Sequence, residues 1–245
     1  MKDGKKTVAV VLAAGSGKRM GSTTKKQYML IGDKPVLYYS LKTFQESFLD
    51  EIILVVSAED IAYCQTQIVE KYGFDKVKHI IEGGKERYHS VARGLECIKD
   101  CDFVFIHDGA RPMVTSEILL RLYNCVKETG ACVAGMPVKD TIKIVDEENT
   151  IISTPERRKL WMVQTPQVFS FSLIRDAYRQ LMDKEQELLE KGITVTDDAM
   201  VVETLTGHSV KLAEGSYENI KITTPEDIRI AESFLMVTEY YYEKE

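Results

Sequence analysis

The sequence lacks several features that would assign the protein to a special class. No apolar stretch approaches the ~20 residues that a membrane-spanning helix needs. No internal repeat, low-complexity tract or linker is present. The cysteines are odd in number and form no C-x-x-C pair, which argues against a disulfide framework or a zinc site: Cys64, Cys97, Cys101, Cys125 and Cys132. We therefore expect reduced, mostly buried thiols in a cytoplasmic protein, with no membrane partner.

The chain also has no excess of positive charge. Its 245 residues carry a net charge of −6, with 44% apolar and 29% charged residues. This acidic balance argues against a general nucleic-acid surface, so we expect no nucleic-acid partner. The length suits one substantial core, which predicts a single domain over residues 1–245.

The most informative segment lies near the N-terminus, where an apolar run ends in a glycine-rich loop. Residues 8–12 lead directly into A-A-G-S-G at positions 13–17, and four cations follow closely: Lys18, Arg19, Lys25 and Lys26. A strand that ends in such a loop directs backbone N–H groups toward an anion. The spacing fits neither the Walker loop nor the dinucleotide fingerprint, and a plain strand-to-helix turn with solvated lysines is the alternative. The neighbouring cations favour a nucleoside-triphosphate site.

Apolar strands and amphipathic helices alternate through the first half of the chain. The expected strands are Val8–Leu12, Ile52–Val56, Val77–Ile81, Phe103–Ile106 and Ala131–Ala134. The expected helices are Val36–Phe44, Asp60–Lys71, Tyr88–Ile98 and Glu117–Glu128. This alternation predicts a mostly parallel sheet with helices on both faces, and ligands bind at the carboxyl ends of such strands. The glycine loop and the segment His107–Arg111 both lie at strand ends.

The alternation changes near residue 138. Two short strand candidates, Thr141–Val145 and Thr150–Ser153, flank a polar turn and predict a β-hairpin arm at about 138–160. An isolated hairpin is only marginally stable, so the arm packs on a partner subunit or remains a flap on a monomer. The pattern alone does not choose between these two arrangements.

The last third of the chain predicts further regular elements. Residues 161–169 form a core strand interrupted at Pro166, and a long helix follows. A short helix after Thr196, two strands and a last helix that begins at Thr224-Pro225 complete the pattern. The ranges are Ser172–Lys191 for the long helix, then Val210–Ala213 and Ile220–Thr223 for the strands.

A few polar side chains are candidates for chemistry. Asp108 follows a buried strand beside the phosphate loop, where it either helps hold Mg²⁺ or caps a turn. His107 is better explained as a hydrogen-bonded side chain than as a ligand. Lys221 alternates with apolar neighbours and faces either water or the site, and Thr196 or Asp197 is expected to cap the short helix.

No Ser-His-Asp or Cys-His constellation is present. Nucleotidyl transfer to a phosphate monoester needs none, because the monoester's second pKa is about 6 and it is largely a dianion at neutral pH. Such a reaction depends instead on cations that bring two polyanions together and stabilise the departing pyrophosphate.

Taken in order, the motifs resemble one known family over nearly the whole chain. The segments are L-A-A-G-S-G-K-R-M-G, K-K-Q-Y, G-G-K-E-R-Y-H-S, H-D-G-A-R-P, P-V-K-D-T-I-K, R-R-K-L-W, Q-T-P-Q-V-F, T-D-D-A and N-I-K-I-T-T-P-E-D. They are similar to those of the 2-C-methyl-D-erythritol 4-phosphate cytidylyltransferases. The first segment is shared with sugar-nucleotidyltransferases generally, whereas the set from H-D-G-A-R-P onward is more specific.

The resemblance implies a Rossmann-like α/β fold of the nucleotidyltransferase type and a homodimer whose β-arms reach into each other's sites. It implies that CTP and 2-C-methyl-D-erythritol 4-phosphate give 4-diphosphocytidyl-2-C-methyl-D-erythritol and pyrophosphate, a step of the non-mevalonate isoprenoid pathway. The substrate phosphate attacks the CTP α-phosphate in line. Mg²⁺, or another divalent cation, is the implied cofactor.

The resemblance also implies residue roles. For the nucleotide it implies that cytosine is recognised by Ala13, Ala14, Gly84 and Ser90, and that Arg87 supports this pocket. It also implies that the loop glycines Gly15 and Gly17 bind the nucleotide and that Asp108 faces the ribose and Mg²⁺. For the reaction it implies the cations Arg19, Lys26 and Lys221, together with Arg157 from the neighbouring subunit's arm. For the polyol phosphate it implies Arg111, Thr196 and Lys221, with Thr141 and Arg157 from that arm.

The chain departs from the family pattern at a few positions. Lys25 stands where the family has Pro. The register of the following Gln27-Tyr28 assigns the catalytic role to Lys26, and Lys25 either shares that role or has no part in it. Arg157 and Arg158 are adjacent, and the offset to Leu160-Trp161 selects Arg157. A ribitol-5-phosphate cytidylyltransferase is the nearest alternative. A non-catalytic nucleotide-sugar-binding module is less favoured, because it would lack the cations Arg19 and Lys26.

Overall fold

The computed structural model describes residues 1–15 and 24–242, with side chains through residue 236. Gly17, Lys18 and Arg19 of the glycine-rich loop therefore lie outside the described residues.

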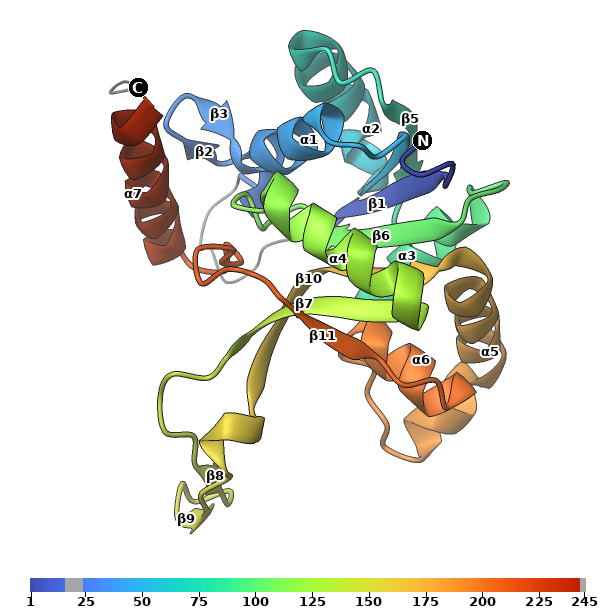
Figure 1. The fold of residues 1–245 in the computed structure, drawn as a ribbon, viewed down its shortest axis with the longest axis vertical. Coiled ribbons are helices and arrows are strands. Elements are labelled where there is room, and N and C mark those ends of the chain that lie inside the picture. Colours follow the sequence, from blue (N-terminus) through green and yellow to red (C-terminus); the bar gives the residue numbers. More distant parts are fainter. Residues whose placement is uncertain (16–23, 243–245) are drawn as a thin grey trace.

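The described chain is built on a seven-stranded central sheet (Figure 1). Its buried strands follow from apolar runs such as Val8–Leu12, which have no polar face to expose. Strand β10 runs antiparallel to its two neighbours, and the other pairings are parallel. From one edge to the other the sheet reads β11 (Lys211–Glu214), β7 (Ala131–Pro137), β10 (Trp161–Ser170), β6 (Phe103–Asp108), β1 (Thr7–Ala13), β4 (Glu51–Val56) and β5 (Val77–Glu82). The predicted mostly parallel sheet is confirmed.

Strand β1 lies between β6 and β4, and this register brings the predicted ligand-binding segments together. Leu12 pairs with Asp108 of β6, and Ala13 pairs with Val56 of β4. The glycine-rich segment therefore leaves the sheet beside the acidic end of β6.

Helices cover both faces of the sheet, as predicted (Figure 1). One apolar cluster joins β1 side chains such as Val11 to α1 (Val36–Glu46), α4 (Ser116–Thr129), α2 (Ile61–Tyr63) and η4 (Cys64–Glu70), and the short turn η3 (Ala58–Asp60) precedes α2. The opposite cluster joins Val10 to α3 (Arg87–Glu96), α5 (Phe171–Glu190) and α6 (Asp198–Thr206). The alternation of Val10 and Val11 between the two faces follows from the period of two in a strand.

A third, smaller cluster lies beyond the carboxyl ends of the strands. The C-terminal helix α7 (Pro225–Tyr242) packs on the small hairpin of β2 (Leu30–Ile31) and β3 (Lys34–Pro35). Ile31, Ile222 and Ala231 are buried together there. Helix α7 begins at Pro225, as predicted, and the Asp227 carboxylate accepts the N–H groups of residues 223 and 224.

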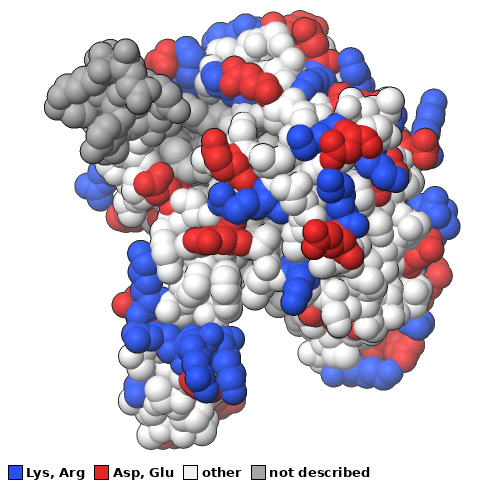
Figure 2. All heavy atoms as spheres, viewed as in Figure 1, with Lys and Arg blue, Asp and Glu red and all other residues white. Residues whose placement is uncertain are grey.

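The predicted hairpin is confirmed as an arm that projects from the sheet (Figure 1). It carries β8 (Ile144–Val145), β9 (Ile151–Ser153) and the short turn η5 (Arg157–Lys159). Ile152 is 64% exposed, and Ile142, Ile144, Val145 and Ile151 are exposed as well. Figure 2 shows Lys and Arg side chains gathered on the visible face of this arm.

Some sequence expectations are wrong. Residues 220–223 form no strand in the described chain; the Ile222 N–H bonds to the Ala110 carbonyl, so the segment passes beyond the carboxyl end of the central strand β6 instead of joining the sheet. The first arm strand covers Ile144–Val145 only. Two thiols, Cys64 and Cys132, are buried and the other three are partly exposed, so "mostly buried" overstated their burial.

No helix in the described ranges combines the length and apolar content that a membrane span requires.

Candidate active site

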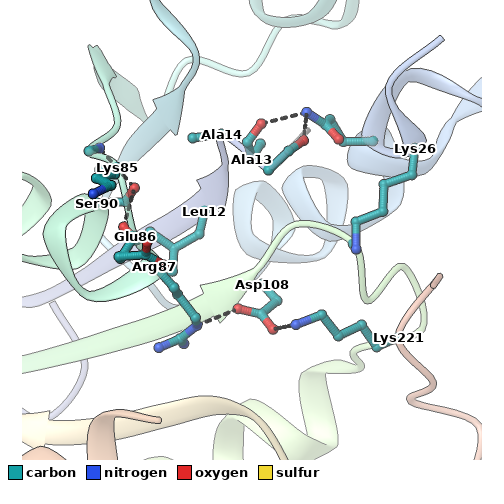
Figure 3. Close-up of a pocket in the computed structure, with 14 residues that line it drawn as sticks. Leu12, Ala13, Ala14, Lys26, Lys85, Glu86, Arg87, Ser90, Asp108 and Lys221 are labelled. Carbon is teal, nitrogen blue, oxygen red and sulfur yellow. Dashed lines mark hydrogen bonds and ion pairs between the residues drawn. The ribbon is translucent and has the colours of Figure 1, made fainter. Parts of the chain in front are cut away.

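A cavity of about 380 Å³ opens at the carboxyl ends of β1 and β6 (Figure 3). Its walls come from the glycine-rich segment, η2 (Lys26–Tyr28), the β5–α3 junction, the end of β6 and the crossing segment at residue 221. The lining residues are Leu12, Ala13, Ala14, Gly15, Lys26, Gln27, Gly84, Lys85, Glu86, Arg87, Ser90, Asp108, Ala110 and Lys221. The structure thus brings together all the described residues that the sequence proposed for the nucleotide, together with Lys26 and Lys221.

Asp108 lies at the centre of the site's charges. Its carboxylate accepts one hydrogen bond from Arg87 Nε at 3.1 Å and another from Lys221 Nζ at 2.6 Å (Figure 3). The residue is only 8% exposed. Burial opposes ionisation, but the charges of Arg87 and Lys221 outweigh it and hold the pKa of Asp108 well below its ordinary value. The two alternatives for Lys221 are thereby resolved, because its ammonium faces the site.

His107 and Thr165 fix the backbone on which Asp108 stands. The Asp108 N–H donates to Thr165 Oγ1 at 3.0 Å, and Thr165 Oγ1 lies 3.1 Å from His107 Nδ1. His107 Nε2 lies 3.2 Å from the Arg111 carbonyl. Because the carbonyl can only accept, these contacts assign the imidazole proton to Nε2. Burial lowers the pKa of His107 to about 3, so the ring is neutral, as expected for a hydrogen-bonded rather than ligating histidine.

Arg87 joins Asp108 to a buried carboxylate that the sequence did not reveal. Its Nη1 and Nη2 donate to the two oxygens of Asp198 at 2.9 and 2.8 Å. Tyr178 of α5 donates its hydroxyl to the same carboxylate. Asp198 is fully buried at the start of α6, whereas Asp197 is the N-cap and accepts the Met200 N–H. No local signal in the sequence places Arg87 beside Asp198, because the two residues lie 111 positions apart and meet only in the folded chain.

The β5–α3 junction requires glycine at position 84. A Cβ placed there would lie 2.2 Å from the Cβ of His89. The Gly84 N–H donates to Ser90 Oγ at 3.0 Å, and Ser90 is buried in the first turns of α3. This close approach holds the backbone of residue 84 against the cavity.

The turn η2 supplies Lys26 and Gln27. Lys26 Nζ donates to the Ile222 carbonyl at 3.0 Å, and Gln27 Nε2 donates to the carbonyls of Ala13 and Gly15 at 2.7 and 3.2 Å. The ammonium of Lys25 points elsewhere and contacts carboxylates beyond the end of β4. The placement therefore favours Lys26 over Lys25 as the cation at the cavity.

A second cavity of about 340 Å³ adjoins the first and shares Arg87, Asp108 and Lys221 with it. Two predicted substrate residues, Arg111 and Thr196, line this cavity. Arg111 Nη1 donates to the Asn219 carbonyl at 2.8 Å. Its Nε is buried without a protein partner, so the guanidinium retains an unused donor beside this cavity.

The arm residues Thr141 and Arg157 do not join either cavity within one chain. Both are exposed, and Arg157 Nη1 donates to the Lys139 carbonyl at 3.0 Å at the base of the arm. Two of the predicted substrate-binding residues are thus separated from the others in the single chain.

The described residues contain no cluster of three or more potential His, Cys, Asp or Glu metal ligands. Both oxygens of Asp108 already contact cations. Mg²⁺ in nucleotide sites is commonly held by one or two carboxylates plus substrate phosphates. The site fits a metal that arrives on phosphate oxygens, with Asp108 as the protein carboxylate beside it, rather than a protein-built cage.

A mostly parallel α/β sheet with a glycine-rich strand end, a buried carboxylate and several converging cations is typical of a nucleotidyltransferase. A profile of the family "IspD: 2-C-methyl-D-erythritol 4-phosphate cytidylyltransferase" matches residues 7–237, and the chain belongs to this family. It is therefore a cytidylyltransferase that joins CTP and 2-C-methyl-D-erythritol 4-phosphate.

Individual relatives agree with this membership. The chain is 49% identical to the 2-C-methyl-D-erythritol 4-phosphate cytidylyltransferase of Lachnoclostridium phytofermentans over 94% of this chain and 96% of that protein. It is 52% identical to the enzyme of Lachnospira eligens over 93% of this chain and 98% of that protein. A crystal structure of 4-diphosphocytidyl-2C-methyl-D-erythritol synthase from Anaerococcus prevotii superimposes with a TM-score of 0.81 at 34% identity, covering 96% and 97% of the two chains. The ribitol-phosphate alternative is not favoured.

Proposed function

We propose that the first cavity binds CTP and that the second binds the polyol phosphate, so that the reacting phosphates meet where the two share walls. The observation that carries this proposal is the row Arg87–Asp108–Lys221, which lines both cavities. Cytosine is recognised by Ala13, Ala14, Gly84 and Ser90, with Arg87 supporting that wall. The tight Gly84–Ser90 contact supports this part, because a fixed backbone discriminates between bases better than a mobile one.

The chemistry is in-line attack by an oxygen of the substrate phosphate on the α-phosphorus of CTP. A new P–O bond forms as the bond to the β-phosphate oxygen breaks, and the electron pair leaves with pyrophosphate. The attacking dianion needs no general base. Lys26 stabilises the triphosphate together with Arg19, which lies outside the described residues, and Lys221 bridges the incoming phosphate and the α-phosphate.

Asp108 has two roles in this proposal. It keeps Lys221 and Arg87 in place through the contacts described above and it faces the ribose. Asp108 would stand beside Mg²⁺, or another divalent cation, that arrives on the phosphate oxygens, and such a metal would supply neutralisation of charge on the leaving group.

The polyol phosphate binds Arg111 and Thr196 on one side and residues of a neighbouring subunit's arm on the other. We propose a homodimer formed by arm exchange, in which Thr141 and Arg157 enter the partner's second cavity. The exposed apolar residues of the arm support this arrangement, since burying them requires a second surface. We further propose that residues 1–245 act as one nucleotidyltransferase domain, with the arm at 138–160 used for dimerisation. CTP and the free thiols fit a cytoplasmic enzyme.

The role of Lys26 is tested by Lys26→Met, which keeps the length of the side chain and removes its charge. We expect kcat for pyrophosphate release to fall about 10²–10³-fold, the cost of removing one transition-state donor. Lys42→Met, at a surface pair with Glu46, is the matched control and should leave kcat unchanged. Activity of Lys26→Met equal to that of the control would contradict the assignment.

A further inference from the structure

The turn η2 has few features of its own that would fix its position. It is three residues long and has no side-chain cap. Lys26 of this turn lines the first cavity, and Gln27 holds the carbonyls of Ala13 and Gly15. Any shift of η2 therefore moves a cation and the start of the glycine-rich loop together.

Both ends of η2 are attached to one carboxylate beyond the end of β4. Lys25, immediately before the turn, donates from Nζ to Asp60 Oδ2 at 2.7 Å and to Glu59 Oε1 at 2.6 Å. The hydroxyl of Tyr28, the last residue of the turn, donates to the same Asp60 Oδ2 at 3.1 Å. Ser57 Oγ completes the set at 3.0 Å from Lys25 Nζ.

The contact between Lys25 and Asp60 is largely shielded from solvent, whereas Glu59 is exposed. The side chain of Lys25 is 22% exposed and that of Asp60 15%. Screening by water is weaker for such a pair than for a surface salt bridge. Burial opposes the charge on Lys25, but Asp60 and Glu59 outweigh it and raise the lysine's pKa, so the ammonium persists at neutral pH.

Ser57 also extends the anchor to the loop itself. Its hydroxyl donates to the Ala14 carbonyl at 3.2 Å while it accepts from Lys25. The anchor thus connects β1, the end of β4 and η2, the three segments that surround Lys26.

We propose that Lys25 is a positioning residue of the cytidylyltransferase reaction, which holds η2 through Asp60 and Glu59 so that Lys26 faces the phosphates. The proposal rests on the role proposed above for Lys26. It assigns no contact between Lys25 and substrate.

The backbone supplies a way to separate position from charge. Lys25 has φ −62° and ψ 139°. Proline holds φ near −65°, so Lys25→Pro keeps this conformation by covalent restraint after the ammonium has gone. Lys25→Ala removes the ammonium without adding the restraint.

The experiment compares kcat and KM for CTP in Lys25→Ala, Lys25→Pro and the surface control Lys42→Ala. We expect Lys25→Ala to lower kcat about tenfold, because small displacements of a reacting group cost up to about 10²-fold in rate. Lys25→Pro should stay within about twofold of the parent enzyme, as should the control. Equal losses in Lys25→Ala and Lys25→Pro would overturn the proposal and make the ammonium itself the active group. No loss in either variant would overturn it as well.

A second variant covers the case in which Lys25→Pro does not fold, as judged by its thermal unfolding. The double variant Glu59→Gln/Asp60→Asn keeps Lys25 and weakens its anchor, and it should lower kcat about as much as Lys25→Ala does. An unchanged kcat would contradict the proposal. Lys26→Met, measured alongside, separates the two hypotheses: if it loses activity while the anchor variants do not, only the positioning role fails.

Discussion

Burial alone would raise the pKa of the Asp108 carboxyl, yet two cations keep it ionised at the meeting point of two cavities. The neighbouring residue His107 shows the opposite outcome, because its ring is fully buried and burial lowers its pKa enough to keep it neutral. Adjacent side chains on β6 thus differ in charge because one faces cations and the other faces neutral dipoles.

The buried state of His107 makes stability depend on pH. The unfolded chain protonates this ring near pH 6.5, whereas the folded protein does so only near pH 3. Between these values the unfolded state binds more protons, so the free energy of unfolding falls as the pH drops, by about 1.4 kcal/mol per pH unit from this residue. We expect His107→Gln to flatten that slope in denaturant titrations between about pH 6 and pH 4.

The comparison concerns the slope rather than the level of stability, since the substitution also perturbs the hydrogen bonds to Thr165 and Arg111. His208→Gln, at an exposed position, is the control and should keep the parent slope. A slope in His107→Gln equal to that of the parent would show that the ring does not remain neutral on folding.

At the scale of elements, the site depends on where strands end and helices begin. The β5–α3 junction is the most closely packed of these places, because residue 84 meets His89 of α3 at a distance that no side chain tolerates. The periodic apolar pattern of the sequence predicts the strand and the helix on either side of this junction. It does not predict how closely the two elements approach each other.

Gly84→Ala should displace the start of α3. We expect a loss of stability of about 1–3 kcal/mol from overpacking, and a raised KM for CTP because Ser90 moves away from the backbone of residue 84. Thermal unfolding and steady-state kinetics measure the two effects. Gly15→Ala is the matched control for stability, since a Cβ there has nothing within 4 Å. Equal stability of the two variants would show that α3 yields without cost.

Sequence reasoning fails at the element scale where a segment is shaped by its surroundings. Residues 220–223 are predicted as a strand because apolar and polar residues alternate there, yet the Ile222 N–H bonds to Ala110 and the segment passes beyond the carboxyl end of β6. The alternation reflects burial of Ile222 in the third cluster and contact of Lys221 with Asp108, which gives the same period of two without sheet pairing.

At the scale of the whole molecule, the arm is the feature that one chain does not explain. It projects from the sheet with the side chains of Ile142, Ile144, Val145, Ile151 and Ile152 exposed, and Arg157 lines neither of the two cavities. Exchange of arms between two subunits would provide both a cover for these side chains and the missing substrate contacts.

Mixing two inactive variants tests arm exchange directly. Arg157→Ala disables the arm and Lys26→Ala disables the body, so each homodimer should be inactive. A heterodimer contains one site with an intact body and an intact arm. After co-refolding at equal amounts we expect about a quarter of the parent activity, since half the dimers are mixed and each has one of two sites intact. Activity no greater than the sum of the separate variants would argue against shared sites.

The sequence by itself determined the class of fold, the order of most elements and the loops that line the cavity, because apolar periodicity and glycine at strand ends are local properties. It also supplied the motifs that match the family. Only the tertiary structure decided how charges pair: Lys221 reaches Asp108 across 113 positions, and Arg87 reaches Asp198 across 111. Such pairs depend on how strands register and helices pack, and no local pattern in the chain records the distance between two segments that meet only after folding.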